Sequence, residues 1–284
     1  MKDFYKGSLA IIAATVFWAI GGGVFNKLLF AQGFPLVWSS FFGFLVGAIV
    51  LFAYSKARGL TQGKELFENK FFYGLCASSA LVALFSFLSY QSIAIGESAF
   101  LQMLSVPLAP LAAWLFLKEK FYWKTMLAVA IALAGLFAIN GFSLSFPLEG
   151  AFFAVASAFA AVSTLLFSRL LKKEFNALLA CYVFFAGAII TLLIALFSAP
   201  FPVLTVGIAL LLLGLGVVDL ALGDGLRIYS VSKTPVHVIG LLELFQAVTF
   251  PLAGWLAFGE SLAMNTLFGG FLVVLSGIVV LWGK

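Results

Sequence analysis

The sequence P-L-A-A-W-L at residues 110–115 recurs as P-L-A-G-W-L at residues 251–256. A glutamate follows each copy nine residues after its proline, Glu119 in the first and Glu260 in the second. The two copies are 141 residues apart, close to half of the 284-residue chain. Self-similarity on this scale indicates that the fold is built from two related halves.

Composition places the chain in a membrane. Hydrophobic residues make up 64% of it, charged residues make up 10%, and the mean hydropathy is +1.18. A soluble domain carries about 25% charged residues. Apolar runs of about 20 residues are long enough for helices to cross the lipid hydrocarbon core, whereas a β-barrel would show short alternating segments. We therefore expect an all-α integral membrane protein embedded in the lipid bilayer.

The apolar runs predict ten transmembrane helices joined by short polar loops. Every Lys and Arg except Lys27 falls on one side of this arrangement. Because cytoplasmic loops carry the basic excess, we expect a plasma-membrane protein with both termini in the cytoplasm. This topology accounts for the net charge of +5 without a nucleic-acid partner. The predicted spans cover roughly 8–30, 35–54, 71–92, 97–117, 122–140, 148–169, 177–198, 204–226, 235–258 and 264–282.

Five spans in each half make the two halves antiparallel. The first half is expected in residues 1–143 and the second in residues 144–284. An odd number of spans returns the chain to the opposite side of the membrane, so the second half begins outside. Inverted repeats of this kind are typical of secondary transporters, whose substrate sites lie near the midplane between the repeats.

This arrangement resembles the EamA-type transporters of the drug/metabolite transporter superfamily. The match rests on Pro110 through Lys118-Glu119 and on Pro251 through Gly259-Glu260, followed by Gly135 and Gly277 in the closing spans. The resemblance implies a basket-like bundle in which spans 1, 3, 4, 6, 8 and 9 surround a central cavity. Spans 5 and 10 would be peripheral and offer a surface for a homodimer. Amino acids and related metabolites are what such exporters commonly carry.

Glu243 is the leading candidate for a functional residue. Ionisable side chains inside spans are costly and mark functional sites by default. Glu243 precedes Pro251 by eight residues, as Gln102 precedes Pro110, so the two halves differ in charge at equivalent positions. A carboxylate on the cavity wall would bind a proton or a substrate ammonium group. The alternative is a buried carboxyl group that only holds helices together.

Other candidates lie on the same predicted cavity. Asp219 falls near the middle of span 8 and could share a proton with Glu243, or could face a packed helix across nearby glycines. Trp18 and Tyr90 could form an aromatic wall for a ring or a cation. We expect Asp224 and Arg227, three residues apart, to form a local ion pair.

The repeated motif itself is expected to play a structural part. Pro107, Pro110 and Pro251 each remove a helical hydrogen bond and so shape spans 4 and 9 beside the cavity. Glu119 and Glu260 are expected to cap or link helices at its rim without touching substrate.

The chain lacks the signatures of the common enzymes. It has one His, no His-Glu-x-x-His and no Gly-x-Ser-x-Gly. On an α-helix, Asp219 and Asp224 would point about 140° apart, so they would not form an aspartyl protease pair. We expect neither catalysis nor a cofactor or metal.

A gradient-driven carrier is the best interpretation. Few cationic side chains lie within the spans, which favours a small neutral, zwitterionic or cationic solute such as an amino acid over a phosphate. We expect export by alternating access. The alternatives are a proton-coupled carrier of aromatic or quaternary-ammonium cations, a nucleotide-related metabolite exchanger, and a scaffold that does not transport.

Overall fold

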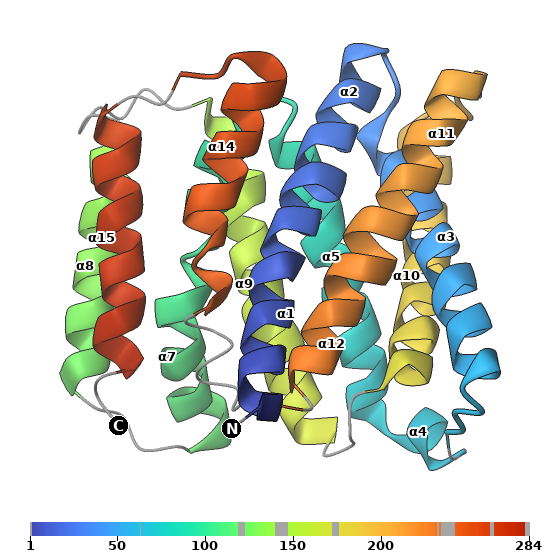
Figure 1. Cartoon of the computed structure of the whole chain (residues 1–284), viewed down its shortest axis with the longest axis horizontal. Helices are drawn as coiled ribbons and strands as arrows, with labels where there is room; N and C mark the ends of the chain where they lie inside the picture. The colour runs from blue at the N-terminus through green and yellow to red at the C-terminus, as the bar shows by residue number, and fades with distance from the viewer. Residues whose placement is uncertain are drawn as a thin grey trace.

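The computed structural model describes residues 2–62, 64–118, 123–139, 147–171, 176–231, 233, 242–261 and 264–281. Within these ranges every regular element is a helix, and the long helices stand side by side in one bundle (Figure 1). Helices satisfy their own backbone hydrogen bonds, which an apolar run inside lipid must do. The all-α prediction is confirmed.

The first half of the chain supplies the following elements: α1 (Lys2–Trp18), η1 (Ala19–Phe25), α2 (Asn26–Ala31), α3 (Leu36–Ala57), α4 (Glu65–Glu68), α5 (Lys70–Ser89), α6 (Ile95–Gln102), α7 (Ser105–Leu117) and α8 (Trp123–Ile139). The second half supplies α9 (Leu148–Leu171), α10 (Ala177–Ser198), α11 (Val206–Gly214), η2 (Leu215–Asp224), α12 (Gly225–Val231), α14 (Gln246–Phe258) and α15 (Met264–Leu281). The elements η1 and η2 are π-helical.

Seven helices in the described ranges are long and apolar enough to cross a membrane. They match predicted spans 1 to 4 and 6 to 8. Three shorter apolar helices, Met126–Gly135, Gln246–Phe258 and Met264–Ser276, stand where spans 5, 9 and 10 were expected. The chain is therefore a multi-pass membrane protein, and ten crossings remain a prediction.

The closest helix pairs join the two halves of the sequence. α5 packs along α9, α3 along α10, and α8 along α15. The α8–α15 pair stands at one edge of the bundle (Figure 1), and it corresponds to the predicted peripheral spans 5 and 10. The start of α1 and the end of α15 lie at the same end of the bundle (Figure 1), which we call the terminal end.

Hydroxyl groups hold the α5–α9 interface together in addition to its apolar contacts. Thr164 donates to Ser78 at 3.0 Å, and Ser86 lies 2.9 Å from Ser157. Each of these four side chains is buried or half-buried. A hydrogen bond between helices is worth about 0.6 kcal/mol on average in a membrane, so the series fixes the register of the two helices more than it adds to stability.

Candidate functional site

Two π-helices touch each other at the centre of the candidate site. η1 carries Gly21 and Gly22, and η2 carries Asp219. A Cβ atom on Gly21 would lie 2.6 Å from the backbone nitrogen of Asp219, and one on Gly22 would lie 2.7 Å from its Oδ1. Only glycine fits at such a distance. π-Helical turns inside α-helices are frequent at functional sites.

Asp219 is enclosed by this contact. Asp219 is 6% exposed, and its carboxylate lies against the Gly22 backbone. Asp219 therefore faces a packed helix, which is one of the two arrangements raised by the sequence, and proton sharing with Glu243 stays a prediction. A buried ionisable group inside a span is costly and is a functional candidate by default.

The prediction that Asp219 and Asp224 diverge is wrong. Hydrogen bonds in a π-helix run between residues five apart, so these two residues lie on nearly the same face of η2. Their carboxylates are close enough to interact electrostatically. Asp224 also accepts a hydrogen bond from Trp18 Nε1 at 3.1 Å, which ties the end of α1 to the end of η2.

Arg227 forms its ion pair with Glu243 and not, as predicted, with Asp224 on its own helix. Its Nε donates to Glu243 Oε1 at 2.7 Å, and it also interacts electrostatically with Asp224. The two paired side chains are 39% and 20% exposed. Trp18, Asp219, Asp224, Arg227 and Glu243 are called the acidic cluster below, because Asp224 and Glu243 interact with the Arg227 guanidinium group and Asp219 interacts with Asp224.

Gln102 is held in a buried network of hydroxyl groups. Its Oε1 accepts from Ser86 at 2.7 Å, and its Nε2 donates to Ser98 at 2.8 Å. Tyr90, which is 3% exposed, lies close to Gln102 and close enough to Asp219 to interact with its charge. Tyr90 therefore connects the predicted residue Gln102 with the acidic cluster.

Both copies of the repeat interrupt their helix at the same place. α6 ends at Gln102 and α7 begins at Ser105, while Glu243 precedes a turn before α14 begins at Gln246. The backbone bonds that close the two turns are also equivalent. The Val106 N–H donates to the Met103 carbonyl, and the Ala247 N–H donates to the Leu244 carbonyl.

Proline explains only one of these interruptions. Pro107 cannot donate to the Met103 carbonyl, which explains the first interruption. The equivalent position in the second half is Val248, whose N–H bonds to Phe245. The remaining motif prolines do not interrupt their helices, because Pro110 lies within α7 and Pro251 within α14.

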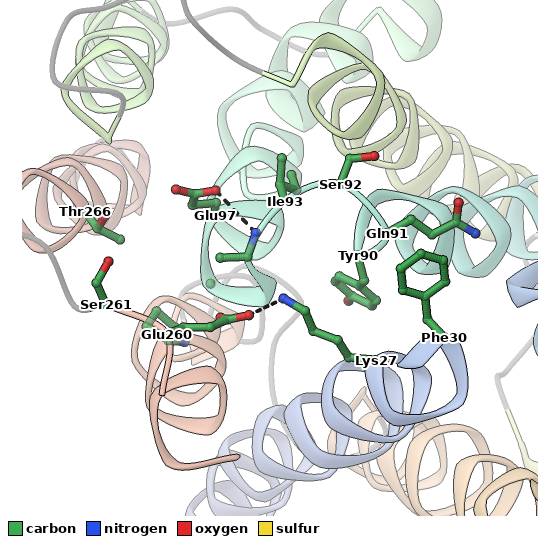
Figure 2. A pocket seen from close by; sticks show the side chains of 13 residues that line it. Lys27, Phe30, Tyr90, Gln91, Ser92, Ile93, Glu97, Glu260, Ser261 and Thr266 are labelled. Atoms are coloured by element: carbon green, nitrogen blue, oxygen red, sulfur yellow. Dashed lines mark hydrogen bonds and ion pairs between the residues drawn. The ribbon is translucent and has the colours of Figure 1, made fainter. Parts of the chain in front are cut away.

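A pocket of about 340 Å³ lies at the end of the bundle away from the terminal end. We call it the distal pocket. Its wall comes from α2, from the connection between α5 and α6 together with the first turn of α6, and from α14, the residues that follow it and the start of α15 (Figure 2). Lys27 crosses the pocket and forms an ion pair with Glu260 (Figure 2), and its ammonium group lies 5.6 Å from the ring of Phe258.

The distal pocket contains residues that sequence reasoning missed as site residues. Besides Lys27 they include Phe30, Gln91 and Glu97, and of the predicted residues only Tyr90, Pro251 and Glu260 line it. Glu260 does link two helices at the rim of a pocket, since Lys27 belongs to α2. Its symmetry-related residue Glu119 lies outside the described residues. The one available signal was that Lys27 stands apart from all other basic residues.

Metal coordination is not supported in the part of the chain that the structure describes. No group of three or more His, Cys, Asp or Glu side chains there could hold a metal ion. The acidic cluster spreads its three carboxylates over two helices, and Asp224 and Glu243 each accept a hydrogen bond from the protein.

Comparison with known proteins identifies the architecture. The model of the EamA-like transporter family matches the chain twice, over residues 5–141 and 148–282. One crystal structure is similar over 96% of this chain and 96% of its own, with a TM-score of 0.69 and 16% sequence identity. No curated protein matches. The family matches cover both halves of the sequence, and the structural match shows the fold.

Proposed function

Because the chain belongs to the EamA-like transporter family of the drug/metabolite transporter superfamily, we propose that it is a gradient-driven exporter. Its solutes would be small neutral, zwitterionic or cationic metabolites such as amino acids. We further propose that it crosses the plasma membrane ten times as two inverted five-helix repeats, with both termini in the cytoplasm. The two family matches and the equivalent helix interruptions in the two halves support this arrangement.

The acidic cluster is the observation that carries the proposal. It places three carboxylates and one guanidinium group where η1, η2 and α12 meet the segment before α14. Phosphate recognition relies on cationic side chains, and here the single arginine is already paired with Glu243. An excess of carboxylates favours a proton or an ammonium group as the cargo or coupling species.

The interrupted helices support transport by alternating access. Secondary transporters commonly bind substrate where transmembrane helices are discontinuous. Gln102 and Glu243 stand directly before the two interruptions, so equivalent positions in the two halves present an amide and a carboxylate. In this mechanism Glu243 exchanges a proton with water on each side in turn, while Gln102 holds its helix in place through Ser86 and Ser98.

The test is Glu243→Gln in liposomes. The neutral side chain imitates a permanently protonated site, so we expect proton-driven flux to be lost while solute counterflow persists. Glu149→Gln is the matched control, because Glu149 is exposed at the start of α9 and lies outside the acidic cluster. Undiminished proton-driven flux in Glu243→Gln would remove Glu243 from the mechanism and transfer the role to Asp219.

One observation favours the second candidate, a proton-coupled carrier of aromatic or quaternary-ammonium cations. Two aromatic side chains stand beside carboxylates, Trp18 at Asp224 and Tyr90 near Asp219. Aromatic faces next to negative charge bind quaternary ammonium groups through cation–π contacts. Competition by benzyltrimethylammonium but not by amino acids would favour this candidate over the first.

A further inference from the structure

The distal pocket has the size and construction of a small-molecule site. Its volume of about 340 Å³ lies at the lower end of the range for such sites. Three parts of the chain that are far apart in sequence form its wall. Two of these parts are in close contact, because Pro251 packs against Gly96. No residue of the acidic cluster lines the pocket, so the two sites are distinct.

The charges in the pocket do not cancel. Lys27 is compensated by Glu260, and the side chains of this pair are 25% and 15% exposed. Glu97 then remains as an additional carboxylate on the opposite wall (Figure 2). The three groups carry a net charge of −1, so the pocket attracts a cation and repels an anion.

Glu97 also has acceptor capacity to spare. Its hydrogen bond from the Ala94 backbone N–H is 3.3 Å long and uses only Oε2. A carboxylate has two oxygens and about four acceptor positions, so an ammonium group can bind it without displacing the bond to Ala94.

The remainder of the wall combines apolar and aromatic residues with the polar side chains of Gln91, Ser92, Ser261 and Thr266. Phe30, which is 41% exposed, lines the pocket together with Ile93 and Pro251. A large ring on one side of the pocket and a carboxylate on the other suit a ligand that carries an apolar group at one end and a positive charge at the other (Figure 2). We propose that the distal pocket binds small primary amines that carry an aromatic or apolar group, with the ammonium group on Glu97 and the apolar group against Phe30.

This inference rests on the proposed transporter function and adds a second, peripheral binding site to it. The site lies at the external end if both termini are cytoplasmic. A solute would then occupy the distal pocket after leaving the acidic cluster or before reaching it. Tyr90 lines the pocket and interacts with Asp219, so it stands between the two sites.

Calorimetric titration of the purified protein with three probes tests the charge preference. Phenylethylamine is a cation, phenylalanine a zwitterion and N-acetylphenylalanine an anion, and all three carry the same ring. We expect affinity to fall in that order. Equal or tighter binding of N-acetylphenylalanine would overturn the proposal.

Matched variants then locate the binding. Glu97→Gln should weaken phenylethylamine binding about tenfold, and Glu149→Gln should leave it unchanged. The double variant Lys27→Met with Glu260→Gln removes both charges of the ion pair and keeps the net charge at −1, so it should still bind phenylethylamine more tightly than N-acetylphenylalanine. Unchanged binding in Glu97→Gln, or loss of this charge preference in the double variant, would refute the site.

Two further measurements separate folding and transport from binding. Glu97 also accepts a hydrogen bond from the start of its own helix, so Glu97→Gln removes part of a helix cap as well as a charge. If Glu97→Gln folds poorly, Glu97→Asp takes its place, because it keeps the charge and should retain binding. Amino-acid flux in wild-type liposomes without any amine binding would eliminate the distal site and leave the transporter proposal intact. Amine binding in a protein that shows no flux would eliminate the transporter proposal and leave the distal site intact.

Discussion

The Lys27–Glu260 ion pair tests how firmly the two halves are held together at the distal pocket. The pair joins residues 233 positions apart in the sequence. A fully exposed pair contributes about 0.2–1 kcal/mol, and removing one partner of a buried pair costs about 3–5 kcal/mol. With side chains 25% and 15% exposed, the pair lies between these limits. We expect a coupling free energy of about 1–2 kcal/mol.

A double-mutant cycle measures this coupling directly. Lys27→Met, Glu260→Gln and the double variant would be unfolded in detergent micelles beside the wild type, with tryptophan fluorescence as the signal. Each single change leaves one charge without its partner, so the double variant should lose less stability than the two single variants together. Glu260→Gln should also lower the amount of folded protein more than it changes apparent solute affinity.

Additive effects would contradict this reasoning. Independent sites add within about 0.3–0.5 kcal/mol, so agreement within that margin would mean that the pair contributes no coupling. Exchanging the charges, with Lys27→Glu and Glu260→Lys together, provides the complementary control. The exchanged pair should recover part of the stability that either single exchange loses.

The other predictions concern the glycine contact, the Trp18 hydrogen bond and the topology. Gly21→Ala should destabilise the protein by about 2 kcal/mol or more in thermal unfolding, because its methyl group would overlap the backbone of η2, whereas Gly207→Ala, which has nothing nearer than 4.0 Å, should have little effect. Trp18→Phe removes the indole donor to η2 and should cost about 1 kcal/mol by leaving the half-buried carboxylate of Asp224 with one donor fewer; unchanged stability and flux would show that this bond is dispensable. A cysteine at Gly33 should react with an external impermeant reagent and one at Lys64 should not, and equal labelling would refute the ten-span topology.

The repeat motif predicted more of the architecture than any other feature of the sequence. Its constant offset identified the two halves, which the family matches confirm. It also paired Gln102 with Glu243, and the structure places both residues directly before helix interruptions. These relations depend only on comparing the chain with itself, so they required no knowledge of contacts.

The π-helices were beyond sequence reasoning. With α-helical geometry, Asp219 and Asp224 would lie on different faces of their helix. The wider turn of the π-helix η2 brings them to nearly the same face. The local signal was present in the glycines at 21–23 and at 214, 216 and 223. Glycine permits close approach of backbones, but it does not say which helix approaches or that an extra residue enters the turn.

The distal pocket was also missed, for a different reason. Lys27 and Glu260 meet only because α2 and the end of α14 are neighbours in space, and no periodicity within either segment reports that contact. The sequence assigned Glu260 a linking role from its place at the end of a helix. Its partner could be identified only from the folded bundle.

Because early helices pair with late ones, contacts of the first half form only after the second half has been synthesised. Trp18 finds its hydrogen-bond partner 206 residues later, and Lys27 finds its own 233 residues later. At about 5–20 residues per second, a ribosome needs roughly 10–40 s to add 200 residues. For that interval Gly21 and Gly22 of η1 face lipid or the insertion machinery instead of η2. The nascent first half therefore depends on membrane residence, and on chaperoning within the bilayer, until its counterpart arrives.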